Sequence, residues 1–216
     1  MAVRRHLETP WQAPVHEPTR AALAPVLDDI RRLGLPVILD SGCGDGSSTL
    51  RLGYRHPDAL VIGVDKSEAR LQRLAPTGSV RRGNVWLVRA EVAETWRQLV
   101  LQGTRLTAHY LLYPNPWPKS THLHRRWYGH PAFAALLSLG GRLELRSNWA
   151  VYVAEFGLAL GVAGRSIGIS PLPAAPALTP FEQKYRDSGH ELWRLTSDLD
   201  AKDVVNAADG GRSRRS

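Results

Sequence analysis

Cysteine is nearly absent from this chain: Cys43 is the only one among 216 residues. A lone cysteine excludes an internal disulfide and fits a reducing compartment. Apolar runs are also short, and none approaches the roughly 18 to 20 apolar residues that a membrane-spanning helix needs. Residues 1–20 carry charge but no apolar centre, unlike a signal peptide. We therefore expect a soluble, cytoplasmic protein without a membrane partner.

Lysine is scarce as well, since only four of the 28 basic residues are lysine and the rest are arginine. The formal net charge is +8. A cationic surface attracts polyanions, and arginine adds bidentate phosphate contacts and stacking on bases. The composition favours a nucleic-acid partner, while an arginine-rich surface without a partner remains an open alternative.

Short apolar segments alternate with amphipathic ones along the chain. The pattern predicts seven strands: Val37–Asp40, Leu60–Asp65, Val85–Arg89, His109–Tyr113, Arg142–Arg146, Ser166–Ser170 and Glu191–Thr196. It predicts helices at Thr19–Leu33, Ser48–Arg55, Ser67–Leu74, Val92–Leu101, Ala132–Leu139 and Ala150–Leu160. Strands that alternate with helices indicate an α/β fold, with a doubly wound, mostly parallel, Rossmann-like sheet covered on both faces.

Three alternate glycines, Gly42, Gly44 and Gly46, follow the first predicted strand. They permit a tight turn and a close backbone approach to a ligand at the start of a helix. With Asp40 in front they read D-x-G-x-G-x-G, a spacing common in S-adenosylmethionine-dependent methyltransferases and distinct from the dinucleotide pattern. Another nucleotide-binding doubly wound domain stays open. Cys43 is expected to fill the turn rather than act as a nucleophile.

Acidic residues follow the first three predicted parallel strands. Asp40 would suit the ammonium group of the cofactor, and Asp65 its ribose hydroxyls. Glu91 is placed to border the adenine. Loop and acids in this order predict an S-adenosylmethionine site made of Asp40, Gly42, Gly44, Gly46, Asp65 and Glu91.

The fourth predicted strand runs directly into Pro114-Asn115-Pro116-Trp117-Pro118-Lys119. A basic run with His122, His124, Arg125 and Arg126 follows at once. Loops at the carboxyl ends of strands carry the chemistry in open α/β sheets. Trp117, Trp127 and Trp149 either pack under their loops or stack on bases, which contributes ~1–3 kcal/mol per base. The two histidines have no further metal ligands at useful spacing, so we expect no metal.

Taken together, these motifs resemble the tRNA (guanine-N7)-methyltransferase family. The family's P-D-P-W-x-K motif stands here as Pro114 to Lys119, and its T-D-W motif as Ser147 to Trp149. Its T-x-F-E-x-K/R motif stands as Thr179 to Lys184. The resemblance covers about 37–194. It implies a class I methyltransferase fold that uses S-adenosylmethionine to methylate N7 of a guanine in the variable loop of tRNA.

The resemblance and the pattern of the residues together give a domain layout, and the resemblance implies site residues. The methyltransferase domain would span 34–200. The composition predicts an N-terminal arm and helix at 1–33 and a disordered tail at 201–216. Asn115 would take a catalytic, cofactor-proximal position. The expected substrate contacts, with two arginines added from the basic run, are Lys119, Arg125, Arg126, Asn148, Thr179, Phe181 and Glu182.

Asn115 and Asn148 stand where the family has aspartate, so a negative charge is lost at each position. Guanine N7 has a lone pair and no proton to lose, so no general base is required. An amide oxygen still accepts a hydrogen bond, although more weakly than a carboxylate. Glu182 would remain as the carboxylate for the Watson–Crick donors of guanine.

Other functions stay open at this point. Asn115-Pro116-Trp117-Pro118 is close to the Asn-Pro-Pro-aromatic loop of methyltransferases that act on exocyclic amines. Another base nitrogen, a small-molecule or protein substrate, and a non-catalytic protein that binds RNA and S-adenosylmethionine are the alternatives. The protein is expected to be a monomer or a homodimer.

Overall fold

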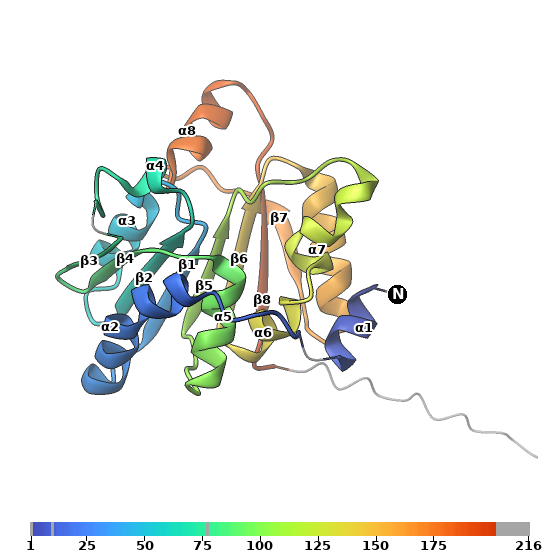
Figure 1. The fold of residues 1–216 in the computed structure, drawn as a ribbon. Helices are drawn as coiled ribbons and strands as arrows, with labels where there is room; N and C mark the ends of the chain where they lie inside the picture. The colour runs from blue at the N-terminus through green and yellow to red at the C-terminus, as the bar shows by residue number, and fades with distance from the viewer. Residues whose placement is uncertain (1, 10, 77, 202–216) are drawn as a thin grey trace, which may run out of the picture.

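The computed structural model of the chain describes residues 2–9, 11–76 and 78–201. Within them, eight strands form one sheet in the order β3-β4-β2-β1-β5-β6-β8-β7 (Figure 1). The strands are β1 Val37–Ser41, β2 Leu60–Asp65, β3 Ser79–Arg82, β4 Val85–Arg89, β5 Ala108–Leu112, β6 Arg142–Ser147, β7 Gly168–Pro171 and β8 Trp193–Asp198. The five central strands pair in parallel, and β3, β7 and β8 run antiparallel to their neighbours. The predicted mostly parallel α/β sheet is confirmed.

The sheet has one strand more than the seven expected, because β3 was not predicted. Its sequence, Ser-Val-Arg-Arg, is largely polar and lies at the edge of the sheet. The two residues Gly83 and Asn84 connect it to β4, and Gly83 has a φ of 60°. A Gly-Asn pair between two extended segments is a hairpin signal that the sequence carried.

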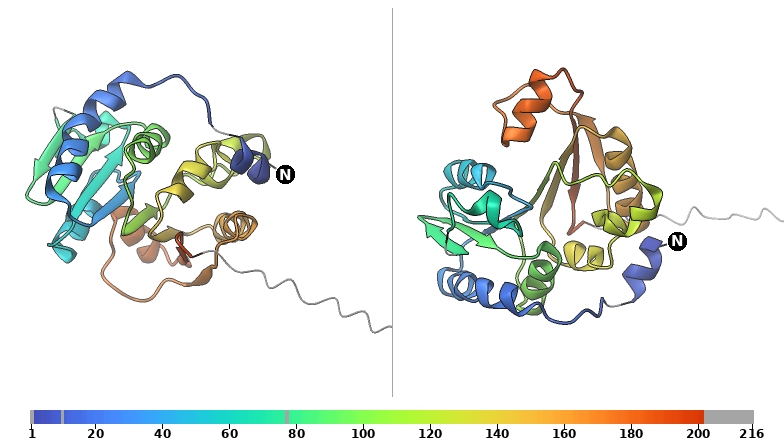
Figure 2. Two further views of the ribbon diagram at one scale, coloured as in Figure 1. Left: turned by 90° about the horizontal axis from the view of Figure 1, so that it is seen from below. Right: turned by 45° about the horizontal axis from the view of Figure 1, so that its top comes forward.

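Helices cover both faces of the sheet (Figure 2). One apolar layer joins α2, α5, α6 and α7 to one side of the strands, and the other joins α3 and α4 to the opposite side. Neighbouring residues of β1 show the division, since Leu39 belongs to the first layer and Ile38 to the second. The helices are α1 Ala2–Glu8, α2 Glu17–Leu33, α3 Ser47–Arg55, α4 Glu68–Leu71, α5 Val92–Leu101, α6 Phe133–Ser138, α7 Ala150–Val162 and α8 Pro180–Asp187, with short 3-10 helices η1 Ser120–Arg125 and η2 Trp127–Gly129.

Every residue of β1 and β2 is buried, as expected for strands covered on both faces. The carboxyl ends of β1, β2, β4, β5 and β6 meet at one edge because these strands are parallel. Figure 1 shows α8 above this edge, with the chain after β5 crossing toward α7. The glycine loop and the segments after β5 and β6 therefore lie along the same edge.

The N-terminal arm differs from the expected layout, and most of the expected tail lies beyond the described residues. Residues 2–8, expected to be part of an irregular arm, form α1, which contacts α6 and α7. The tail expected to be disordered lies outside the described residues apart from Ala201. None of the helices in the described ranges is long and apolar enough to cross a membrane.

Candidate functional site

The glycine loop leaves β1 with three left-handed residues. Gly42, Gly44 and Gly46 have φ angles of 76°, 61° and 83°, a region that side chains rarely adopt. A Cβ atom on Gly46 would lie 2.9 Å from a methyl of Leu87, so this glycine packs against the sheet. At Gly42 and Gly44 a Cβ would meet nothing within 4 Å. The loop thus packs through Gly46 and leaves open space beside Gly42 and Gly44.

Asp40 is fully buried beneath this loop. Its Oδ2 accepts hydrogen bonds from Ser48 Oγ at 2.6 Å and Thr49 Oγ1 at 2.8 Å, and its Oδ1 has no partner. Burial raises the pKa of Asp40 to about 6, against the opposing effect of the two hydroxyls. Asp40 therefore anchors the first turn of α3, and Oδ1 is the oxygen that remains for a ligand.

Asp65, at the end of β2, holds the glycine loop from the other side. Its Oδ2 accepts from the Gly44 N–H at 3.0 Å, and its Oδ1 accepts from the Ser67 N–H at 2.8 Å. Between Asp40 and Asp65, the thiol of Cys43 is buried, and burial together with both carboxylates raises its pKa. Cys43 therefore stays protonated, which agrees with the interpretation that it fills the turn.

Glu91 precedes the first turn of α5, and its position depends on the N-terminal region. Its N–H donates to Thr19 Oγ1 at 2.9 Å, and Thr19 on α2 is fully buried. The Glu91 carboxylate is about half exposed, with Lys66 Nζ 3.7 Å away. The sequence did not indicate that Thr19 supports Glu91, because the hydroxyl of a threonine in the first turn of a helix usually bonds within its own helix.

The loop after β5 adopts a strained conformation. Tyr113 and Trp117 have positive φ angles of 54° and 45°, although neither is glycine. Such residues cost about 1–3 kcal/mol each and persist where surrounding contacts enforce them. The exposed Asn115 closes a turn by accepting the Trp117 N–H on Oδ1 at 3.1 Å. This bond orients the amide, so Asn115 presents its NH₂ group to ligands.

An exposed group of cations and aromatic rings lies beside that turn. The guanidinium of Arg125 lies 4.8 Å from the centre of the Trp117 ring, and His122 meets the same ring edge-on at 5.4 Å. Lys119 is exposed at the start of η1. Trp127, in contrast, packs inward on Trp96 at 4.7 Å. Trp117 and the cations of Lys119 and Arg125 are thus available to a partner, whereas Trp127 is not.

Arg126 differs from its expected role as a substrate contact. It is 9% exposed and donates inward to backbone carbonyls of the loop and to Glu155 and Tyr128. Arginine has five N–H donors, and these partners occupy both edges of its guanidinium. Arg126 therefore holds the loop rather than facing a phosphate.

Asn148 belongs to an aromatic cluster that joins the segments after β5 and β6. Its Nδ2 lies 3.3 Å from His190 Nδ1. The ring of Tyr185 lies 5.3 Å from His190 and 5.6 Å from Tyr113, and the half-exposed Phe181 stacks on it at 6.4 Å. Neither Tyr185 nor His190 was among the expected site residues, although both follow the Thr179–Lys184 motif closely.

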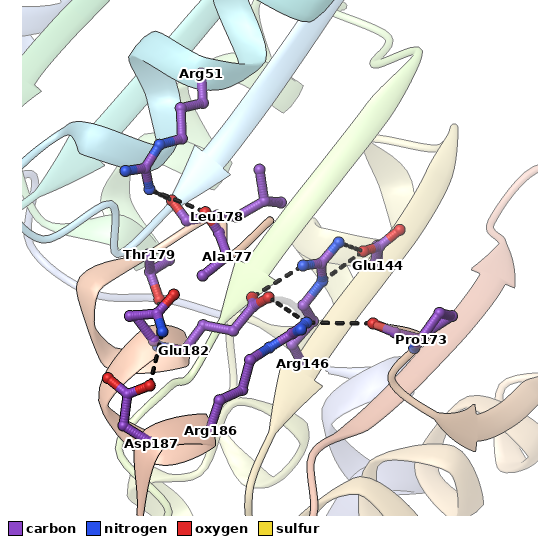
Figure 3. A network of polar contacts seen from close by, with 11 residues as sticks. Arg51, Glu144, Arg146, Pro173, Ala177, Leu178, Thr179, Glu182, Arg186 and Asp187 are labelled. Carbon is purple, nitrogen blue, oxygen red and sulfur yellow. Dashed lines mark hydrogen bonds and ion pairs between the residues drawn. The ribbon is translucent and has the colours of Figure 1, made fainter. Parts of the chain in front are cut away.

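Glu182 requires a correction. We expected it to accept from guanine, but it is fully buried, with Oε2 2.9 Å from Arg146 Nη1 and Oε1 3.0 Å from Arg186 Nη2 (Figure 3). A base cannot reach this carboxylate unless α8 moves. Thr179 is likewise the helix cap, since its Oγ1 accepts the Glu182 N–H at 2.9 Å. The motif therefore attaches α8 to β6.

A second set of bonds fixes the segment that leads into α8. Arg51 on α3 donates to the carbonyls of Ala177 at 3.1 Å and Leu178 at 2.7 Å (Figure 3). Arg186 also donates to the Pro173 carbonyl at 3.2 Å. These contacts hold α8 above the carboxyl edge from two sides.

Other candidate sites are weaker. A cavity of about 430 Å³ lies among Leu106, Arg142 and Asp198, at the opposite edge of the sheet. Ligands of open α/β sheets bind outside the carboxyl ends of the strands, so we place the site at the glycine loop. Among the residues that the structure describes, no group of three or more His, Cys, Asp or Glu side chains could hold a metal ion.

Known proteins resemble this chain in sequence and in fold. The sequence model of a family described as "Putative methyltransferase" matches residues 35–195. The chain is 30% identical over 188 residues to a tRNA (guanine-N(7)-)-methyltransferase of Mycobacterium avium (strain 104), covering 82% of this chain and 71% of the relative. It is 31% identical over 173 residues to a protein of the same name from Leifsonia xyli subsp. xyli (strain CTCB07), covering 74% of each.

Among solved structures, the chain is similar to the crystal structure of the 16S rRNA methyltransferase KamB, with a TM-score of 0.61. The identity is 17%, and the match covers 81% of this chain and 93% of that one. At this identity the likeness concerns the fold alone.

Proposed function

The chain belongs to the tRNA (guanine-N7)-methyltransferase family, and from this premise we propose that it transfers the methyl group of S-adenosylmethionine to N7 of a guanine in tRNA. The observation that carries the proposal is the meeting of two groups of residues at one sheet edge. The glycine loop and its acids lie at the ends of β1, β2 and β4, and Asn115 lies beyond β5 with exposed cations beside it.

The residues of the glycine loop fit S-adenosylmethionine. The open space beside Gly42 and Gly44 admits a ligand against the backbone. The unpartnered Oδ1 of Asp40 would accept a hydrogen bond from the ammonium group of the cofactor. Asp65 would bind the ribose hydroxyls, and Glu91 would border the adenine. When bound, the cofactor supplies an electrophilic methyl group on a sulfonium.

Methyl transfer to N7 requires these residues to position the two reactants, and it requires no residue to remove a proton. Displacement at a methyl group requires an in-line approach in a site that excludes water. Because guanine N7 carries a lone pair and no proton, asparagine at 115 and 148 removes no obligatory base. Asn148, with His190, and the Tyr113–Tyr185 pair would form the wall against which the base is placed.

The orientation of Asn115 favours N7 over an exocyclic amine. Its Oδ1 accepts from Trp117 N–H, so the group presented to a substrate is the NH₂ donor. The N7 edge of guanine carries two acceptors, N7 and O6, and a donor suits O6. An exocyclic amine would instead require the amide oxygen, which already accepts from Trp117 and has one lone pair left. Asn115 therefore supports guanine N7 as the target atom.

The exposed cations provide the contact with tRNA. Lys119 and Arg125 make no ion pair with described residues, and Trp117 adds a partly exposed ring beside them. Such a surface attracts the phosphate chain and stacks on an unpaired base. The proposal places the protein in the cytoplasm with its substrate, as a monomer or homodimer that needs no metal, with residues 34–200 as the catalytic domain.

The test is to incubate the full chain with S-adenosylmethionine and unmodified tRNA transcripts and to map the product by mass spectrometry. We expect 7-methylguanosine at one position. A different methylated base would overturn the N7 assignment. Retained binding of tRNA and cofactor without any methyl transfer would instead identify a binding protein. An inactive preparation that binds neither would overturn the function as a whole.

A further inference from the structure

The loop that carries Asn115 has little backbone hydrogen bonding of its own. Its three prolines, Pro114, Pro116 and Pro118, have no N–H to donate. The Tyr113 N–H donates to the backbone carbonyl of Arg146 on β6, and the Trp117 N–H donates to the Asn115 side chain. The loop is also strained at Tyr113 and Trp117, so its shape must be enforced from outside.

Arg126 supplies that external support. Its Nε donates to the Trp117 carbonyl at 3.0 Å, and its Nη2 donates to the Pro118 carbonyl at 3.2 Å. These two carbonyls are adjacent in the chain, and a planar guanidinium reaches both with parallel donors. A lysine ammonium at this place would be a point charge without that fork.

The other edge of the Arg126 guanidinium is fixed to the body of the protein. Nη1 lies 2.8 Å from the Tyr128 hydroxyl and 2.5 Å from Glu155 Oε2, and the Tyr128 hydroxyl donates to the same carboxylate oxygen. Glu155 lies on α7, the helix that begins two residues after Asn148. Arg126 thus connects the Asn115 loop to the helix that follows Asn148.

The neighbouring Arg125 shows that this arrangement is specific to one position. Arg125 is the last residue of η1, and Arg126 leaves that helix with extended backbone angles, φ −74° and ψ 136°, so the two side chains take different directions. Arg125 accordingly lies exposed on the Trp117 ring, while Arg126 is buried beneath the loop. Of these two adjacent arginines, Arg125 is available to a partner at the surface, and Arg126 makes contacts inside the protein.

We propose that Arg126, held by Glu155 and Tyr128, is a positioning residue that sets the loop carrying Asn115 against the end of β5. It acts through the carbonyls of Trp117 and Pro118 and not by binding phosphate. The activity readout rests on the proposed function, whereas the loop-exchange readout below does not.

Arg126→Lys separates this role from phosphate binding, because the charge stays and the fork is lost. We expect kcat for tRNA methylation to fall at least about tenfold, as displaced reacting groups do. The tRNA dissociation constant should stay within about twofold, with an unchanged salt slope, because no phosphate contact is lost. Amide exchange measured by mass spectrometry should rise in the peptide that covers 113–126.

Two comparison variants make the outcome interpretable. Arg125→Ala should weaken tRNA binding and lower the salt slope, without raising exchange in 113–126. Arg31→Lys, on the exposed face of α2, should behave as wild type in every measurement. Glu155→Gln keeps the size of the side chain and should raise loop exchange less than Arg126→Lys, which provides a test if Arg126→Lys does not fold.

Three results would overturn the proposal. One is a loss of tRNA affinity and salt slope in Arg126→Lys like that of Arg125→Ala. Another is unchanged exchange in 113–126 for both Arg126→Lys and Glu155→Gln. The third is wild-type kcat in a folded Arg126→Lys. If the wild type itself methylates no tRNA, the proposed function fails, and the exchange measurement still decides the role of Arg126.

Discussion

Glu182 and Arg146 form an ion pair inside the protein, with Oε2 2.9 Å from Nη1, across 36 positions of sequence. The pair joins α8 to β6, and Arg186 adds a second arginine to the same carboxylate. Because Glu182 is fully buried, its charge has been withdrawn from water and depends on these partners. One carboxylate thus carries both ion pairs that attach α8 to its neighbours, beside the backbone contacts made by Arg51.

Glu182→Ala should therefore destabilise the protein strongly. Removing one partner of a buried pair costs up to about 3–5 kcal/mol, and the Glu144 carboxylate, 2.6 Å from Arg146 Nη2, offsets part of that loss. Urea unfolding followed by circular dichroism measures the change. Asp187→Ala, five residues on, removes only an exposed contact with Gln183 and should stay within about 0.5 kcal/mol of wild type. Equal stability of the two variants would contradict the role given to Glu182.

Asp40 gives the unliganded protein a defined dependence on pH. Its pKa is about 6 in the folded state and 3.8 by default, so between these values the folded state holds a proton that the unfolded state has released. The contribution of Asp40 to the free energy of unfolding is on the order of 3 kcal/mol at low pH, and it is lost as the pH rises from about 4 to about 6. Asp40→Asn removes the effect.

The check is urea unfolding of wild type and Asp40→Asn at pH 4 and pH 7, without cofactor. The variant should gain on wild type by on the order of 2–3 kcal/mol between the two pH values. Parallel pH curves for the two proteins would show that Asp40 keeps its ordinary pKa.

The same variant should bind S-adenosylmethionine less well. A neutral amide cannot supply the charge-assisted hydrogen bond that a carboxylate makes with an ammonium, so we expect affinity to fall at least about tenfold. Isothermal titration calorimetry at pH 7 measures this. Binding as tight as that of wild type would remove Asp40 from the cofactor site. A stabilised variant with weakened binding would show that burial of this acid serves the ligand rather than the fold.

Asn115→Asp tests the donor role of the amide. The carboxylate can still accept the Trp117 N–H, but it has no hydrogen to offer guanine O6. We expect kcat/KM for tRNA to fall about tenfold or more, with unchanged thermal stability. Higher activity in Asn115→Asp would mean that the asparagine is a weakened form of the family's aspartate.

Lys119→Ala and Arg125→Ala should each weaken tRNA binding and reduce its salt slope by about 1, because each removes one phosphate contact. Filter binding over a range of salt concentrations measures both. Arg20→Ala, which removes an exposed cation paired with Glu17, serves as the matched control and should leave the slope in place. Identical slopes for all three variants and wild type would point to a substrate other than RNA.

The sheet and its edge were predictable, because buried apolar runs and turn glycines follow directly from the sequence. The cap made by Thr179 was predictable too, since it needs only the three-residue spacing to Glu182. The partners of Glu182 were not, because Arg146 is brought to it by the fold. Nor does the sequence distinguish Arg125 from Arg126, since the difference depends on backbone angles that neither side chain determines.

The bond from the Glu91 N–H to Thr19 bears on where this protein can be shortened. The region that matches the family begins at residue 35, after α2 has ended. A chain cut there would keep the glycine loop and the acids, but it would lose the hydroxyl that receives the Glu91 N–H, together with the apolar face of Leu23 and Val26. The proposed catalytic residues lie within 34–200, but the smallest folded unit able to hold the cofactor should therefore begin before His16, whose ring contacts Thr19.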